Sequence, residues 1–182
     1  MLDRSLWLEQ LLAHLSRCGS EGQAALNYLM DHRVKVSLHN QPTAARWTLT
    51  GRLELHPRYA DGAPDAAYPL SLVIHEVQHL QQGFFTALSV YGELEAWQLQ
   101  FSFLKSLTGN YYPDLHRNEI IQELISLPLN GNRDALRRAR QLMQRYAGRQ
   151  YRVDLLPLYP LPNEIIFILT HREFGSDNHP QN

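Results

Sequence analysis

The 182-residue chain contains a single cysteine, Cys18, which excludes a fold held together by internal disulfide bonds. Its charges nearly cancel, with a formal net charge of −1 at pH 7, so no general affinity for nucleic acid is expected. No stretch approaches the roughly 18 to 20 continuous apolar residues of a membrane span. Residues 1–5 run into an amphipathic segment without the apolar core of a signal peptide. We therefore expect a cytoplasmic protein without a membrane span, although export by a route that needs no signal peptide stays open.

The most informative motif is the H-E-x-x-H at residues 75–79, which follows the nearly unbroken apolar run 70–74. On a helix, residues four apart lie about 40° from each other around the axis, so His75 and His79 face one side. Two neutral imidazoles so placed can bind one zinc ion, and the intervening Glu76 can reach a water on that metal. The alternative is a pair of core histidines that hydrogen-bond to the backbone. Because unpaired buried polar groups cost on the order of 1–3 kcal/mol each, we favour a metal that satisfies all three side chains.

A catalytic zinc usually takes three protein ligands, so a third ligand is expected downstream of the motif. The metzincin extension would place glycine at position 82 and histidine at position 85, where this chain has Gln82 and Phe85. Glu93 and Glu95 instead offer two carboxylates at the start of the next segment with helical periodicity. These two residues lie about 200° apart around a helix, so we expect only one of them to face the metal.

With these residues the chain resembles the gluzincins, zinc peptidases whose third ligand is a glutamate on the helix after H-E-x-x-H. The resemblance lies in motifs alone and covers roughly residues 33–107. It implies Glu93 as the third ligand, because that glutamate is commonly followed at the third position by a small residue, here Ala96; Glu95 stays the alternative. The relatives often carry an aspartate that orients a ligand histidine at the position of Trp97. The partners that orient these imidazoles therefore stay unidentified.

Hydrophobic spacing predicts a small sheet that lies between N-terminal helices and a longer helical part. The motif helix is expected to end at Gly83, and Ser20-Glu21-Gly22-Gln23 resembles a capping box at the start of the second helix. Residues 155–162 hold three prolines and predict an extended strap. The other predictions are helices at 4–17, from 20, at 69–82, 92–107, 117–126, 133–147 and around 165–169, a strand at 34–38, and a hairpin of 47–49 and 53–55.

This order of elements predicts the α+β class, and with the resemblance it implies a minimal zincin-like domain. In that domain a small sheet of about three strands packs against the central H-E-x-x-H helix, and further helices follow. We expect one domain at residues 1–175, with a metal-site core at 33–107, a helical extension at 111–175 and a disordered tail at 176–182. In minimal zincins a sheet edge lines the cleft and pairs with an extended substrate, but the sequence does not assign that strand here.

Seven arginines lie between positions 133 and 152, and a helix that carries them could bind an anionic partner. Apolar residues at helical spacing, such as Leu136, Leu142 and Met143, supply a packing face along the same segment. Because the whole chain has no basic excess, we interpret the segment as an amphipathic surface helix and expect no nucleic-acid partner.

The resemblance implies a zinc-dependent metallopeptidase that cleaves a peptide or protein substrate through a metal-activated water, with Glu76 as general base. Compact chains of this type often act on few substrates, as the ImmA-like regulatory proteases do. One alternative is a zincin-fold binding or regulatory module with a structural metal or lapsed activity. Another is a metal-free interaction domain that uses the arginine-rich helix. Relatives often stabilise the oxyanion with a tyrosine or histidine, and the candidates are Tyr91, Tyr111, Tyr112, His116 and His171.

Overall fold

The structure is a computed structural model that describes residues 3–110, 115–129, 132–148 and 151–171. In chain order the elements are α1 (Arg4–Leu15), α2 (Gly19–Asp31), β1 (Lys35–Leu38), β2 (Ala45–Trp47), β3 (Arg52–Leu55), the 3₁₀ helix η1 (Pro57–Asp61), α3 (Ala67–Gln82), α4 (Phe84–Ala87), α5 (Val90–Thr108), α6 (Leu115–Ser126), α7 (Arg133–Ala147), the 3₁₀ helix η2 (Val153–Leu155) and α8 (Leu161–His171). The described part is mostly helical with one mixed sheet of three strands, so the predicted α+β class is confirmed.

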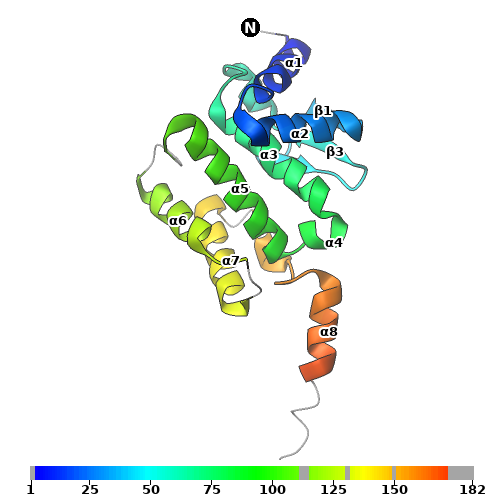
Figure 1. Ribbon diagram of the computed structural model, residues 1–182, viewed down its shortest axis with the longest axis vertical. Helices are drawn as coiled ribbons and strands as arrows, with labels where there is room; N and C mark the ends of the chain where they lie inside the picture. Colours follow the sequence, from blue (N-terminus) through cyan, green and yellow to red (C-terminus); the bar gives the residue numbers. More distant parts are fainter. Residues whose placement is uncertain (1–2, 111–114, 130–131, 149–150, 172–182) are drawn as a thin grey trace, which may run out of the picture.

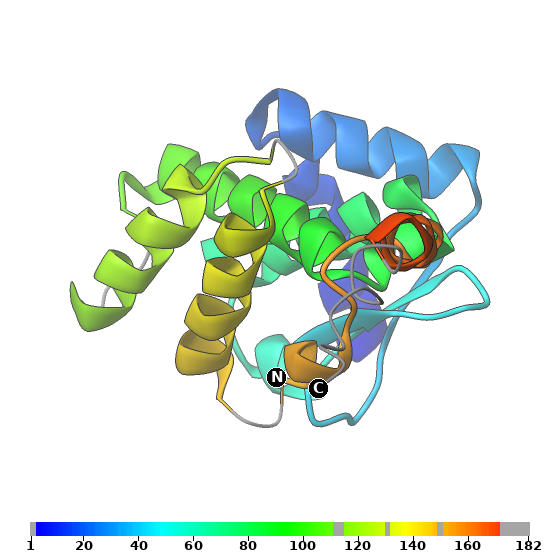
Figure 2. The ribbon, with the colours of Figure 1, turned by 90° about the horizontal axis from the view of Figure 1, so that it is seen from below.

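Helices α3 and α5 lie side by side at the centre of the molecule (Figure 1). One hydrophobic core joins α1, α2, the sheet and α3, and it includes Trp7, Leu53 and Val73. A second core joins α5, α6 and α7, and Phe101 and Leu142 are among its buried members. Seen from below, α6 and α7 lie on one flank of α5, and the β2–β3 hairpin lies on the opposite flank (Figure 2). The α3–α5 pair therefore forms the boundary between two packed halves.

The sheet has the order β1-β3-β2, so β2 is an edge strand. Strands β2 and β3 pair antiparallel and form the predicted hairpin, whereas β1 pairs parallel with β3. Gly51 allows the tight hairpin turn because its φ of 69° lies in the left-handed region. Strand β3 ends at Leu55, and Pro57, which has no amide hydrogen to donate to a strand ladder, begins η1 after His56.

The predicted capping box at residues 20–23 is wrong. Helix α2 already begins at Gly19, whose φ of 78° turns the chain sharply after α1. Ser20 therefore lies within the first turn, where its hydroxyl donates to Glu21, and the Gln23 side chain bonds to Asn27 instead of reaching back. The short helix α4 was also not predicted. Gly83, with a φ of 73°, does end the motif helix as expected.

The arginine-rich helix α7 is amphipathic, as predicted. Leu136, Leu142 and Met143 are buried against α5 and α6. Its arginines pair with nearby carboxylates: Arg138 with Glu123, Arg133 with Glu164 and Arg137 with Asp134. These ion pairs account for much of the positive charge that the sequence places on this helix.

The strap between η2 and α8 supports the first turn of α5. The Pro157 carbonyl accepts a hydrogen bond from the Val90 amide at 2.9 Å, and the Leu158 carbonyl accepts one from Tyr91 at 3.0 Å. Helix α8 then extends away from the body beyond α4 (Figure 1). Among the described residues, no helix combines the length and the apolar character needed to cross a bilayer.

Gly92 is the position where α5 approaches the chain before it most closely. A Cβ atom at this residue would lie 2.0 Å from the carbonyl oxygen of Thr86, which leaves no room for a side chain. We expect Gly92→Ala to lower the free energy of unfolding by about 1–3 kcal/mol through backbone displacement. Urea denaturation monitored by circular dichroism measures the change.

Gly62→Ala is the matched control for that substitution. Its added Cβ would meet its nearest neighbour, the Tyr59 carbonyl oxygen, at an ordinary 3.6 Å, and its φ of −103° suits alanine. Equal stabilities of the two variants would contradict the close approach at Gly92.

Candidate metal centre

Helix α3 brings the two motif histidines together in the interior. His75 and His79 are 7% and 2% exposed, and their Nε2 atoms lie 3.0 Å apart. The helix is continuous from Ala67 to Gln82, so its period alone places both rings on one side. Both rings therefore present a ligand nitrogen to the same point.

Glu93 reaches this point from the first turn of α5. Its Oε2 atom lies 3.7 Å from the Nε2 of His75, and its Oε1 atom lies 3.6 Å from the Nε2 of His79. Ser89 caps the helix by accepting a hydrogen bond from the Gly92 amide, and this cap fixes the turn on which Glu93 lies. The structure thus brings together the three side chains that the motif and the resemblance pointed to.

The three side chains lie close enough together to hold one metal ion. Tetrahedral zinc with bonds of about 2.0–2.2 Å separates neighbouring ligand atoms by about 3.3–3.6 Å. The two nitrogens lie 3.0 Å apart, which is slightly closer than this range, and each nitrogen has a different Glu93 oxygen at 3.6 or 3.7 Å, near the upper end of the range. Two imidazoles and one carboxylate are also a usual donor set for a catalytic zinc, with a fourth position left for water.

Gln82 orients the ring of His79. It is a partner that the sequence did not identify, because Trp97 stands where an aspartate often orients a ligand histidine. The Gln82 amide nitrogen donates to the Gly92 carbonyl at 2.9 Å and to Glu95 at 2.7 Å. Its oxygen therefore accepts from the Nδ1–H of His79, 3.1 Å away. This tautomer leaves the lone pair of the His79 Nε2 free for a metal.

His75 is held less tightly. Its Nδ1 atom is buried without a hydrogen bond of good geometry. The Glu93 charge, the Gln100 side chain and the Ala96 backbone favour a proton on this ring, but burial and His79 outweigh them. Ala96 is itself fully buried at the contact between α3 and α5, so a larger side chain there would displace His75 or the helix.

The three side chains of the cluster together favour one positive charge between them. Burial alone would lower the pKa of His79, but the adjoining Glu93 carboxylate outweighs burial and raises this pKa to about 9. Burial would likewise raise the pKa of Glu93, but His79 chiefly lowers it to about 2. Burial and the neighbouring His79 lower the pKa of His75 to about 3. Without a metal, a proton on His79 supplies the charge, and a divalent cation can replace that proton.

Glu76 lies beside the cluster but does not belong to it. Its side chain is 5% exposed, and burial raises its pKa to about 7. A hydrogen bond from the Trp47 backbone, at the end of the edge strand β2, offsets part of this shift. A carboxyl group with a pKa near neutrality can both accept and donate a proton at neutral pH.

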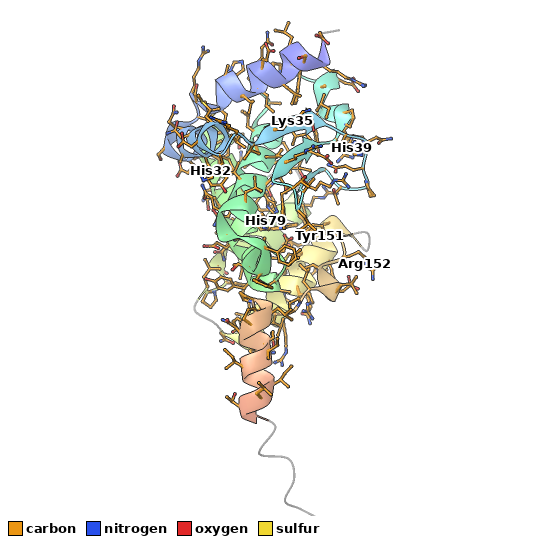
Figure 3. All side chains as sticks on the ribbon, turned by 90° about the vertical axis from the view of Figure 1, so that its right-hand side faces the viewer. His32, Lys35, His39, His79, Tyr151 and Arg152 are labelled. Carbon is orange, nitrogen blue, oxygen red and sulfur yellow. The ribbon has the colours of Figure 1, made fainter. Side chains whose placement is uncertain are left out.

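Tyr151 is a site residue that the sequence did not reveal. Its hydroxyl donates a hydrogen bond to Glu93 and accepts one from the Trp97 indole at 2.9 Å. Tyr151 and His79, which both contact Glu93, are labelled on the same side of the molecule in Figure 3. Burial and the Glu93 charge raise the pKa of this phenol well above its usual value, so it stays a donor.

Of the five candidates for the donor that stabilises the oxyanion, only Tyr91 has a described side chain. Tyr91 packs against the second hydrophobic core. Tyr111 and Tyr112 lie outside the described residues, as do the side chains of His116 and His171. Nothing in the local sequence marks Tyr151, which lies 58 positions from Glu93.

Comparisons with known proteins add no relative. A scan against protein-family models finds no match to this chain, and searches of curated proteins and of solved structures find none either. The chemistry of the centre therefore follows from its own atoms: two imidazoles, two carboxyl groups and a phenol from three separate segments.

The positions of Glu93 and Glu95 predict different effects on metal binding. Glu93→Ala removes an oxygen ligand and should lower zinc affinity by at least about 100-fold. Glu95→Ala removes only a partner of Gln82 and should lower it by about tenfold or less. Competition with a chromophoric chelator measures both affinities. A larger loss in Glu95→Ala than in Glu93→Ala would reverse the assignment of the ligand.

Proposed function

We propose that this protein is a zinc-dependent metallopeptidase with a minimal zincin-like fold. His75, His79 and Glu93 would hold one zinc ion, and Glu76 would act as general base. The observation that carries this proposal is the convergence of three ligand atoms at zinc-compatible distances beside a fourth, non-ligating carboxyl group. A purely structural metal site has no need of that extra buried carboxyl.

Zinc at this centre would supply the acidified water and the polarised carbonyl that peptide hydrolysis requires. Glu76 takes the proton from that water and returns it to the departing amine. Burial raises the pKa of this carboxyl group to about 7 in the metal-free site, which favours its return of a proton to the amine. The Trp47 backbone fixes the carboxyl group in place.

The edge strand β2 supplies a surface for the substrate backbone. The Ala44 carbonyl and the Thr48 amide hydrogen-bond to the β3 side of the hairpin. By strand alternation, the backbone groups of Ala45 and Trp47 face the opposite way, towards α3. The Ala45 carbonyl accepts a hydrogen bond from the Thr43 hydroxyl at 2.9 Å, and the Trp47 amide donates to Glu76. The Ala45 amide and the Trp47 carbonyl are therefore the groups with which an extended peptide would pair by strand addition, which would place its carbonyl next to Glu76.

Tyr151 is our candidate for the donor that stabilises the oxyanion. Its phenol stays protonated in the buried site and already contacts Glu93. Its single O–H proton is donated to Glu93 in this structure, so Tyr151 would turn from Glu93 to the oxygen of a carbonyl polarised at the centre.

Two rival functions receive less support. A binding or regulatory module with a structural metal is favoured by the loosely held His75 ring, but it gives no role to Glu76. An interaction domain that uses α7 is disfavoured because Arg133, Arg137 and Arg138 already pair with carboxylates of the same chain.

The general-base role of Glu76 predicts a loss of turnover without loss of metal. Glu76→Gln should retain stoichiometric zinc and lower kcat by about 10²–10⁴-fold. A quenched fluorescent peptide library measures turnover, and elemental analysis measures zinc. Glu9→Gln is the control, because Glu9 is an exposed carboxylate on α1. Full zinc occupancy with unchanged turnover in Glu76→Gln would refute the mechanism.

The proposed role of Tyr151 predicts an effect on kcat rather than on metal content. Tyr151→Phe keeps the ring that packs against Trp97 but removes the donor. We expect kcat to fall by about 10²–10³-fold, as for loss of one oxyanion donor. Zinc content should stay at one ion per chain. A kcat equal to that of the wild type would remove Tyr151 from the reaction.

A further inference from the structure

A cavity of about 240 Å³ opens beside His75 and Glu76, between residues 42–45 and the first half of α3. Pockets that enclose a drug-sized ligand have about 300–1,000 Å³, so this one suits a single side chain or a chain end. Tyr68 and Phe101 contribute to an aromatic wall. The cavity therefore adjoins the reacting carboxyl group and is large enough for one residue of a substrate.

Two arginines give this cavity a positive character. Arg58 from η1 and Arg117 from α6 both line it, and Glu76 is the sole acidic residue among the described lining residues. The guanidinium of Arg58 lies 5.0 Å from the ring centroid of Tyr59, and that of Arg117 lies 5.4 Å from the ring centroid of Tyr146. The Arg58 guanidinium also donates a hydrogen bond to the Tyr59 hydroxyl at 2.9 Å. A guanidinium carries five N–H donors, so one such bond does not use up its capacity to bind a carboxylate.

The direction of β2 decides which part of a substrate enters the cavity. Ala45, at the start of β2, lines the cavity together with His75, whereas Trp47 lines a second hollow together with His79. Antiparallel pairing, the more stable kind, would run a peptide from the Trp47 end towards the Ala45 end. The residue that follows the scissile bond would then point into the arginine-lined cavity.

We infer that this cavity recognises a substrate carboxylate on the C-terminal side of the scissile bond. The carboxylate belongs either to an aspartate or glutamate side chain or to the free C-terminus of the peptide. Arg58 and Arg117 bind it, and their two charges outweigh the one charge that Glu76 can carry. A lysine or arginine in the same position is repelled. The inference rests on the proposed peptidase function.

Matched quenched peptides test this specificity. They differ only in the residue after the scissile bond, which is glutamate, glutamine or lysine, and each exists with a free and an amidated C-terminus. We expect kcat/KM for glutamate to exceed that for glutamine by about tenfold or more, with lysine cleaved most slowly. If the C-terminus is the carboxylate recognised, amidation of peptides that end one residue after the bond lowers kcat/KM instead.

Substitutions at the two arginines link the preference to the cavity. Arg58→Gln and Arg117→Gln should each lower the ratio of kcat/KM for the glutamate peptide to that for the glutamine peptide. Arg58→Glu should raise kcat/KM for the lysine peptide relative to the glutamate peptide. Arg137→Gln is the matched control, because Arg137 is an exposed arginine that pairs with Asp134 on α7. The control should keep the wild-type ratio. Ratios near one in the wild type, or ratios unaffected by either arginine, would overturn the inference.

A binding measurement separates failure of this inference from failure of the proposed function. Zinc-loaded Glu76→Gln protein is titrated with the same peptides, labelled with fluorescein, and anisotropy is recorded. Tighter binding of glutamate or free-carboxylate peptides, lost in Arg58→Gln, supports the cavity assignment even without turnover. Cleavage that depends on zinc and Glu76 but shows no carboxylate preference would support the proposed peptidase function and contradict the inferred specificity.

Discussion

Two imidazole nitrogens 3.0 Å apart in a buried site would repel one another if both presented lone pairs to an empty space. The Glu93 carboxylate beside them adds a negative charge that burial would otherwise disfavour. A positive charge between these groups resolves both conflicts, and the pKa of about 9 for His79 shows how strongly the surroundings favour one. The packing of α3 against α5 brings His75, His79 and Glu93 together at this charge site.

Small residues and caps maintain that packing. Gly92 allows α5 to begin against the Thr86 carbonyl, and Ala96 allows its next turn to approach His75. Gln82 joins the end of α3 to the start of α5 through Gly92 and Glu95, and in doing so it orients His79. One side chain thus supports the helix contact and the ligand tautomer together. The C-terminal part contributes as well, because Tyr151 bonds to Glu93 and the strap holds the first turn of α5.

Much of the centre could be predicted because its key relations are local. A helical period places His75 beside His79, and alternation with a glycine turn indicates the β2–β3 hairpin. The partners of the cluster depend instead on tertiary packing. Gln82 lies three positions from His79 on α3, but Gly92 and Glu95 of α5 set the orientation of its amide. Tyr151 reaches Glu93 across 58 positions of sequence. The capping box failed because the turn at Gly19 starts α2 before Ser20, which the local pattern does not encode.

The most direct test is anomalous diffraction at the zinc absorption edge, on crystals of protein purified without added metal. The account predicts one peak about 2.0–2.2 Å from the Nε2 atoms of His75 and His79 and from a Glu93 oxygen. It also predicts that Glu76 lies outside that ligand set. Crystals soaked in zinc that show no peak there, with the two rings bonded only to protein groups, would contradict the account.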